Sequence, residues 1–362
     1  MRALVLTTDA FGGHGGLAKY NRDFLTALCT HRSVSEVVAL PRVAARAVGP
    51  IPQGLRFVTD GLGSKRGFLS TLARELVQLK TFDTVFCGHI NLLAPALAAG
   101  LRFRVPVFLL VYGIDVWTRP NYFAPHGCAH IDGFVSISRI TADRFHSWAP
   151  LAGKREWIIP NAIELDRFAP GSKPPALLDR YGLHGRTVLV TLGRLVSAER
   201  MKGIDEVLDV MPTLLATRPN LTYLVVGGGS DKARLEKKAQ TLGISKHVVF
   251  TGEIAEAEKA DHYRLADAYV MPSQGEGFGF VFLEALASGI PVVASMIDGG
   301  REAVRQGELG SLVDPRNPVD IIRGIEEALA RPTGVVPEGL NYFAFPNFTS
   351  RVHAFVDDVI GG

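Results

Sequence analysis

The most informative stretch of the sequence is Ser273-Gln-Gly-Glu-Gly-Phe-Gly-Phe-Val-Phe-Leu-Glu-Ala-Leu-Ala-Ser-Gly-Ile-Pro-Val-Val-Ala294. A short apolar run typical of a strand ends just before it, at Met271, and a helical pattern begins within it near Phe280. Its first three glycines permit a tight loop between strand and helix. Free backbone N–H groups then converge at the helix N-terminus, where they bind anions. The stretch therefore predicts a strand, an anion-binding loop and a helix.

Two carboxylates flank this predicted anion site, Glu276 in the loop and Glu284 roughly a turn into the helix. At 1.5 Å of rise per helical residue, the pair can bracket a ligand about 10 Å long. Carboxylates beside an anion must accept hydrogen bonds from neutral hydroxyls. A sugar nucleotide meets this demand, with its diphosphate on the N–H groups and its hydroxyls on the carboxylates. The alternative for Glu276 alone is an ordinary helix cap.

The rest of the chain repeats short apolar runs separated by amphipathic helical segments, which predicts α/β architecture with parallel sheets. The runs in the first half are 3–7, 37–40, 84–87, 107–111 and 133–137. Those in the second half are 187–192, 222–226, 247–251, 268–271, 291–294 and 311–313. A connector rich in proline and glycine, residues 165–186, lies between the halves. We expect two Rossmann-like domains, residues 1–165 and 166–345, facing across a cleft that holds the active site, with a terminal helix at about 346–362 packing back on the first domain.

Composition excludes several protein classes. The 362 residues are 47% apolar and 21% charged, unlike disordered, collagen-like or disulfide-rich proteins. Three scattered cysteines with no C-x-x-C pair indicate reduced thiols. The longest apolar run is about half of what a membrane helix needs, and the N-terminus lacks a signal-peptide core. We therefore expect a cytoplasmic protein.

Charge is distributed unevenly along the chain. Residues 1–165 hold 18 Lys and Arg against 11 Asp and Glu, a net +7, and the remainder holds 21 against 25, a net −4. Together with the basic amphipathic stretch 65–80, this charge favours peripheral association with an anionic membrane, at the inner face of the cell membrane. We expect no nucleic-acid partner. An ordinary solvated surface and a helix packed on the sheet are the alternatives.

The block at 273–294, the segments Gly193-Arg194-Leu195 and Lys202-Gly203, and Ile159-Pro160-Asn161 together resemble retaining glycosyltransferase family 4, of the GT-B fold. The resemblance covers nearly the whole chain, and the two glutamates match the family's E-x7-E signature. It implies that Glu284 holds the nucleotide ribose. It also implies that Glu276 and the backbone of Gly277, Phe278 and Gly279 contact the donor sugar.

Two cations follow the predicted strand at 187–192. Arg194 and Lys202 occupy the edge at which a parallel sheet presents ligands, so they can neutralise a diphosphate. The resemblance implies that they stabilise the leaving nucleoside diphosphate. The intervening loop is longer than in many family members, which leaves Arg200 as an alternative to Lys202. Ordinary surface charges are the other interpretation.

A second glycine-rich loop, Gly12-Gly13-His14-Gly15-Gly16, follows the first strand and opens a helix. It is not G-x-G-x-x-G, and no acidic residue follows the second strand, which disfavours a nicotinamide cofactor. The resemblance implies that Gly15 and Gly16 approach the donor phosphates. His14 is a candidate to face the acceptor, with a solvated loop histidine as the alternative.

Three further residues are candidates for contact with acceptor or sugar. Tyr112 stands where many family members carry a histidine, and Asp115 follows it closely. A buried tyrosine with a loop aspartate is the alternative for this pair. Ser138 resembles the family's serine-rich cleft segment, but a helix N-cap explains it nearly as well.

Missing motifs complete the prediction. No Asp-x-Asp follows a strand, and neither a P-loop nor G-x-S-x-G occurs, so we expect no bound metal, no cofactor, no NTPase and no hydrolase. The sequence thus predicts a retaining, metal-independent hexosyltransferase. Its partners would be a nucleotide-sugar donor, GDP-mannose or a UDP-hexose, and a glycan or lipid-linked acceptor in cell-surface polysaccharide synthesis. A GT-B-fold epimerase or phosphorylase and a non-catalytic sugar-nucleotide-binding module are the alternatives.

Overall fold

The chain forms two compact units, which a computed structural model describes over residues 1–78, 81–120 and 123–361. Unit 1 comprises Met1–Ala162 and Phe345–Gly362, and unit 2 comprises Ile163–Ala344. The sequence predicts the first boundary at residue 166. The structure places it at Ile163, because a parallel bridge joins Ile163 to Ala344 and the Ile163 N–H donates to the Phe343 carbonyl at 2.9 Å.

Unit 1 is a seven-stranded parallel sheet with the strand order β3-β2-β1-β4-β5-β6-β7. Its elements are β1 (Arg2–Thr7), α1 (Gly16–Cys29), β2 (Glu36–Pro41), β3 (Leu55–Phe57), α2 (Lys65–Gln78), β4 (Thr84–Gly88), η1 (Ile90–Leu92), α3 (Leu93–Phe103), β5 (Val107–Val111), α4 (Ile114–Trp117), α5 (Phe123–Cys128), β6 (Gly133–Ser136), α6 (Arg139–His146), β7 (Arg155–Ile158) and α14 (Phe345–Gly361). Strands β4, β5 and β6 are buried along their whole length, as parallel strands covered by helices must be.

Unit 2 repeats this plan with six parallel strands in the order β10-β9-β8-β11-β12-β13. Its elements are η2 (Leu165–Arg167), α7 (Pro175–Tyr181), β8 (Thr187–Leu192), η3 (Ser197–Lys202), α8 (Ile204–Thr217), β9 (Leu221–Val226), α9 (Lys232–Thr241), η4 (Ser245–His247), β10 (Val248–Gly252), η5 (Glu256–Glu258), α10 (Lys259–Arg264), β11 (Ala268–Met271), α11 (Phe280–Ala287), β12 (Val292–Ser295), α12 (Gly300–Ala303), η6 (Arg305–Gly307), β13 (Ser311–Val313), α13 (Pro318–Leu329) and η7 (Glu338–Phe343). The predicted connector 165–186 contains the short helix α7. Two Rossmann-like domains are therefore confirmed.

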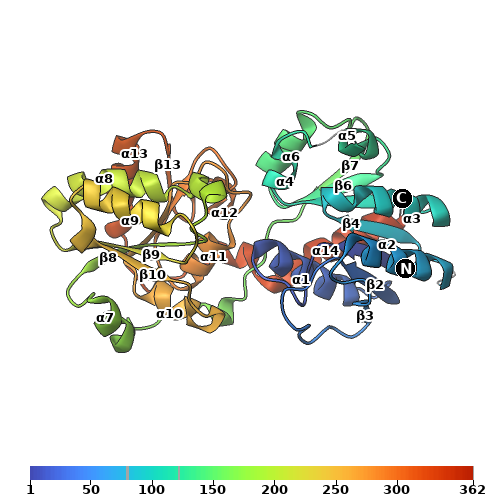
Figure 1. Cartoon of the computed structure of the whole chain (residues 1–362), viewed down its shortest axis with the longest axis horizontal. Coiled ribbons are helices and arrows are strands. Elements are labelled where there is room, and N and C mark those ends of the chain that lie inside the picture. Colours follow the sequence, from blue (N-terminus) through green and yellow to red (C-terminus); the bar gives the residue numbers. More distant parts are fainter. Residues whose placement is uncertain (79–80, 121–122, 362) are drawn as a thin grey trace. The chain divides into compact units, whose positions relative to one another are not determined.

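The C-terminal helix α14 returns to unit 1 and lies beside α1, as Figure 1 shows in red and blue. Its Phe348 packs edge-on against Tyr20 with ring centroids 5.6 Å apart. Farther along, Phe355 joins the aromatic side chains of Phe108 and Trp157. The first and last segments of the chain thus share one hydrophobic core.

Helix α2 uses its apolar face for packing inside unit 1. Phe68 and Leu72 are buried in the same core cluster as Leu4 and Val38 of the sheet. This is the packing alternative for the predicted amphipathic stretch 65–80, whose last residue, Lys80, lies outside the described residues. No helix within residues 1–78, 81–120 and 123–361 is long and apolar enough to cross a membrane.

Candidate functional site

The loops after β8 and β11 meet at the point where the strand order of unit 2 reverses. These strands are neighbours, and the chain continues from them toward opposite halves of the sheet. Open parallel sheets bind ligands at this switch point, beyond the carboxyl ends of the strands. The Gln274 N–H donates to the Met201 carbonyl at 2.7 Å and joins the two loops. The predicted cation segment and the predicted glycine-rich loop therefore lie together.

Segment 298–300, which follows β12, holds the backbone of Glu276 from two sides. The Glu276 N–H donates to Asp298 Oδ2 at 2.9 Å, and the Gly299 N–H donates to the Glu276 carbonyl at 2.8 Å. A Cβ atom on Gly299 would lie 2.1 Å from the Gly277 carbonyl oxygen, a distance that only glycine avoids. The Glu276 side chain remains 21% exposed, so a fixed backbone presents an accessible carboxylate.

Asp298 is a fully buried carboxylate beneath this loop. Burial raises its pKa to about 6, and the N–H groups of Glu276 and Gly300, which donate to its two oxygens at 2.9 and 3.0 Å, oppose that rise. The sequence analysis did not identify Asp298. The Asp-Gly-Gly run at 298–300, three residues beyond the predicted strand at 291–294, was the available signal.

The residues that follow Glu276 lead into α11. Gly279 precedes the helix with a φ of 92°, a left-handed conformation that favours glycine, and as the N-cap residue it has no side chain with which to cap the helix. Phe278 is buried and packs edge-on against Phe343 with ring centroids 5.4 Å apart. The loop backbone, including Gly277, is thereby anchored at the positive end of the α11 dipole.

The two predicted cations form an ion-pair chain with two glutamates. Lys202 Nζ lies 3.1 Å from Glu199 Oε2 and 4.0 Å from Glu276 Oε2, and Arg194 pairs with Glu199 Oε1. Arg194 is 76% exposed, whereas Glu199 is only 13% exposed. The structure thus places Lys202 beside the glycine-rich loop and joins it to Arg194 through Glu199, which the sequence analysis missed.

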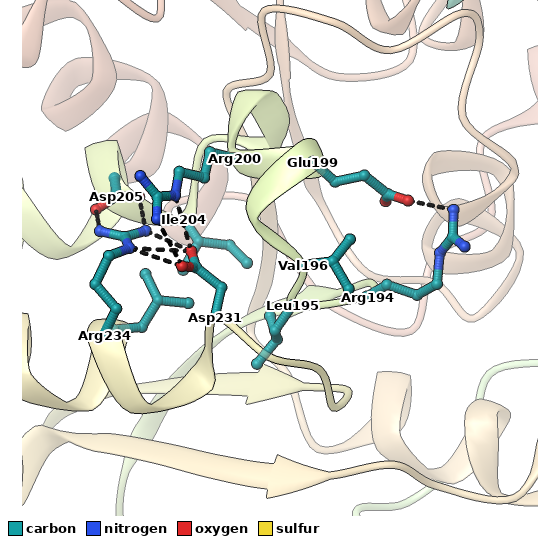
Figure 2. A pocket seen from close by; sticks show the side chains of 10 residues that line it. Arg194, Leu195, Val196, Glu199, Arg200, Ile204, Asp205, Asp231 and Arg234 are labelled. Carbon is teal, nitrogen blue, oxygen red and sulfur yellow. Dashed lines mark hydrogen bonds and ion pairs between the residues drawn. The ribbon is translucent and has the colours of Figure 1, made fainter.

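Arg200 belongs to a separate ion-pair network around Asp231. Figure 2 shows the Arg194–Glu199 pair on one side and Arg200 with Asp231 and Arg234 on the other. Arg200 donates to Asp231 Oδ1 at 2.9 Å, and hydrogen bonds from Arg234, followed by Arg200, lower the pKa of Asp231 to about 2. Arg200 therefore does not take the place of Lys202 in this structure.

Glu284 lies on α11 and is 2% exposed. The Tyr263 hydroxyl donates to its Oε2 at 2.8 Å, and Lys259 Nζ lies 3.4 Å from its Oε1. Burial, and then the charge of Glu284, raise the pKa of Tyr263 well above its usual range, so the phenol stays protonated and acts as a hydrogen-bond donor. Two residues that the sequence analysis missed thus orient the carboxylate.

Unit 1 places its glycine-rich loop after β1, which neighbours β4 at the corresponding switch point. Gly15 precedes α1 with a φ of 87° and has no side chain with which to cap the helix, and Gly16 is the first helical residue. Both glycines and His14 are exposed. Burial raises the pKa of Asp9, at the start of this loop, against opposing effects of Arg22 and His14. The approach of Gly15 and Gly16 to the donor phosphates, and of His14 to the acceptor, stays a prediction.

Tyr112 and Asp115 have partners inside unit 1. The Tyr112 hydroxyl donates to Asn21 Oδ1 at 2.7 Å and lies 3.0 Å from the Gly88 carbonyl. Asp115 accepts the Tyr112 N–H at 3.1 Å, and burial raises the pKa of this carboxyl to about 7. Tyr112 is half-buried and Asp115 lies in the first turn of α4, so the structural alternative of a buried tyrosine with a loop aspartate is met only in part. The contact with acceptor or sugar stays a prediction.

Ser138 is fully buried and caps α6. Its hydroxyl accepts the Thr141 N–H at 3.3 Å and donates to the Thr141 hydroxyl at 2.9 Å. The structure therefore shows the N-cap role, and contact with a sugar stays a prediction. In the described part of the chain, no group of three or more His, Cys, Asp or Glu could hold a metal ion.

His89 is a further residue that the sequence analysis missed. It directly follows Gly88 at the end of β4, and its Nδ1 accepts the Asn91 N–H at 3.1 Å. Burial, and then the charge of Arg42, lower its pKa. This imidazole lies one residue from the Gly88 carbonyl, which contacts Tyr112.

Comparison with known proteins supports the predicted family. Residues 180–338 match the model of the family described as glycosyl transferases group 1. The GDP-mannose-dependent alpha-(1-6)-phosphatidylinositol monomannoside mannosyltransferase of Mycobacterium tuberculosis is 35% identical over 353 residues, 91% of this chain and 89% of the relative. The enzyme of the same description from Mycolicibacterium smegmatis is 35% identical over 231 residues, 61% of this chain and 59% of the relative.

Solved structures agree on the fold. Anabaena HepE, in complex with UDP and glucose, superposes with a TM-score of 0.74 at 19% identity, covering 100% of this chain and 99% of that one. The lipopolysaccharide outer core galactosyltransferase WaaB gives 0.73 at 16% identity, covering 100% and 99%. Together with the relatives above, these findings show that the chain belongs to the glycosyl transferases group 1 and is a glycosyltransferase with the GT-B fold.

Proposed function

We propose that the protein transfers a mannosyl group from GDP-mannose, with retention and without a metal ion, to a hydroxyl of a lipid-linked acceptor. The choice of donor and acceptor is supported by the mycobacterial relatives, which are described as GDP-mannose-dependent and as acting on phosphatidylinositol monomannoside. The HepE complexes with UDP do not weigh against GDP-mannose, because 19% identity is informative for the fold alone.

The observation that carries this proposal is the meeting of Lys202 with the Glu276 loop at the switch point of unit 2. In the proposed complex, Lys202, Arg194 and the N-terminus of α11 bind the donor diphosphate. Glu284 accepts a hydrogen bond from a ribose hydroxyl, and Glu276 accepts one from the mannose.

The proposed reaction proceeds on one face of the donor sugar. The bond between the anomeric carbon and the phosphate oxygen breaks, and the bond between that carbon and the acceptor oxygen forms. The acceptor hydroxyl proton passes to the departing phosphate oxygen, so the products are a mannoside and GDP. Fixed cations and amide dipoles stabilise the negative charge that develops on the leaving diphosphate. These groups supply the electrostatic stabilisation that a metal ion provides in other transferases.

Peripheral membrane association at the cytoplasmic face is proposed from the charge of the N-terminal half, a net +7 over residues 1–165, and from the lipid named in the relatives' descriptions. The apolar face of α2 is packed in the core of unit 1, so it is not available to a membrane. Within this chain, the positive charge is therefore the feature that supports membrane binding. Flotation with vesicles tests the proposal. Binding to phosphatidylglycerol vesicles, lost in high salt, is expected. Equal binding to phosphatidylcholine vesicles, or none to either, contradicts it.

The transfer proposal is tested with GDP-mannose and a phosphatidylinositol mannoside acceptor. We expect a mannolipid with an α anomeric signal by NMR, GDP as the second product, and an unchanged rate in EDTA. UDP-glucose should be a poor donor. GDP-mannose without acceptor should stay intact, which separates transfer from epimerisation, while phosphate should not release mannose 1-phosphate, which separates it from phosphorolysis. Binding of GDP-mannose without turnover on any acceptor would instead support the non-catalytic alternative.

A further inference from the structure

Glu199 occupies an unusual position for a carboxylate in a proposed phosphate site. It pairs with Arg194 through one oxygen and lies 3.1 Å from Lys202 Nζ through the other. These are the two cations assigned to the diphosphate, so a phosphate group and Glu199 require the same partners. The two cations and Glu199 together carry a net charge of only +1.

The Glu199 ion pairs are incomplete. Oε2 of Glu199 is buried, yet in the described part of the chain it accepts no hydrogen bond, because the Lys202 contact lacks hydrogen-bond geometry. A buried acceptor without a hydrogen bond is costly. The pairing is therefore weaker than that of a fully bonded salt bridge, and a phosphate with several acceptor oxygens can replace it.

Other contacts hold Lys202 in place without Glu199. The carbonyl of the preceding Met201 accepts the Gln274 N–H at 2.7 Å. The following Gly203 has a φ of 84° and lies so close to Pro272 that a Cβ atom would approach the Pro272 carbonyl oxygen to 2.4 Å. Loss of the Glu199 charge should therefore leave the backbone of Lys202 unchanged.

The backbone around Glu199 also permits its side chain to withdraw. None of the six residues of η3 is buried, so a rotation there disturbs no core packing. Glu199 itself has φ −117° and ψ 24°, outside the helical range, at a kink within η3. Its N–H donates to the Val196 carbonyl at 2.8 Å, which fixes the start of the turn and not the side chain.

We infer that Glu199 is an electrostatic gate of the donor site: it neutralises Arg194 and Lys202 while the site is empty, and it releases both cations to the donor diphosphate. This inference rests on the proposed function. After transfer, the same carboxylate competes with the product GDP for the two cations and promotes its release. Glu199 thus limits affinity for the nucleotide and favours turnover.

The experiment measures GDP binding by isothermal titration calorimetry to the wild type, to Glu199→Gln and to Glu236→Gln. Glu236 lies on α9, where it pairs with Lys232, so its variant controls for the loss of one negative charge. Glu199→Gln keeps the shape of the side chain and should lower the Kd for GDP about tenfold, a difference of about 1.4 kcal/mol. Glu236→Gln should stay within about twofold. An equal or higher Kd in Glu199→Gln overturns the inference.

Steady-state kinetics supply a second readout that a structural role would not produce. Glu199→Gln should lower both KM for GDP-mannose and kcat, and should make GDP a stronger product inhibitor. Glu199→Asp keeps the charge and should remain closer to the wild type. A fall in kcat with a raised KM would assign Glu199 to positioning the cations and contradict the gate. If the wild type itself does not bind GDP, the proposed function fails as well, whereas wild-type binding of GDP without tightening in Glu199→Gln refutes the gate alone.

Discussion

Replacement of Asp298 by asparagine should change how stability depends on pH. Asp298 is buried, and folding raises its pKa from 3.8 to about 6. Between these values the native state holds a proton that the unfolded state has lost, so the free energy of unfolding falls as pH rises from about 4 to 6. At 1.36 kcal/mol per pKa unit, this fall amounts to about 3 kcal/mol. Asparagine does not titrate, so its variant escapes the fall.

The assay is urea unfolding at several pH values between 4 and 8, with the wild type and Asp298→Asn measured together. The free energy of unfolding of the variant minus that of the wild type should increase by about 3 kcal/mol from pH 4 to pH 7. Asp166→Asn changes an exposed aspartate of the same unit and serves as the control. A difference between Asp298→Asn and the wild type that is constant across this range would refute the reasoning.

Three further predictions concern the site and its support. Lys202→Ala should reduce kcat for mannosyl transfer about 10²- to 10³-fold, as loss of a stabilising donor does. Arg200→Ala should stay within about tenfold, because Arg200 binds Asp231. Equal losses of kcat in the two variants would contradict this assignment. Gly299→Ala places a Cβ atom 2.1 Å from a carbonyl oxygen and should lower the free energy of unfolding by about 1–3 kcal/mol, measured by thermal unfolding. The control Gly361→Ala, whose Cβ atom would meet nothing within 4 Å, should leave stability unchanged. Equal melting temperatures for the two variants would exclude the clash. Glu284→Gln should raise KM for GDP-mannose about tenfold with a smaller effect on kcat, and an unchanged KM would argue against ribose binding.

Most of the fold could be predicted because buried parallel strands are continuous apolar runs. The eleven runs in the sequence correspond to β1, β2, β4, β5, β6 and β8–β13. The two strands that were missed, β3 and β7, lie at the edges of the seven-stranded sheet. β3 has three residues, and β7, Arg155–Ile158, begins with two charged residues. Edge strands are short and half-solvated, so they lack the apolar signal of central strands.

The candidate site could be predicted where its chemistry follows the chain locally. The loop with Glu276, the helix with Glu284 and the cation Lys202 each follow a predicted strand, and the parallel topology brings the two loops to one switch point. The choice between Arg200 and Lys202 needed the structure, since it depends on Asp231, a residue about 30 positions away in sequence.

The residues that support the site were missed because their partners are distant in sequence. Asp298 acts on Glu276 through one hydrogen bond across 22 positions, and Tyr263 acts on Glu284 across 21. Such pairs leave no periodic pattern in a single sequence. Local capping was also indistinguishable from a binding role, as Ser138 and Asp115 show.

A crystal structure of the protein with GDP tests the central claim most directly, which is that unit 2 binds a nucleoside diphosphate at its switch point. The account predicts phosphate oxygens within hydrogen-bond distance of Arg194 and Lys202, a ribose hydroxyl on Glu284, and a Glu199 carboxylate turned away from both cations. GDP bound elsewhere, with the Glu199 ion pairs intact, would contradict it.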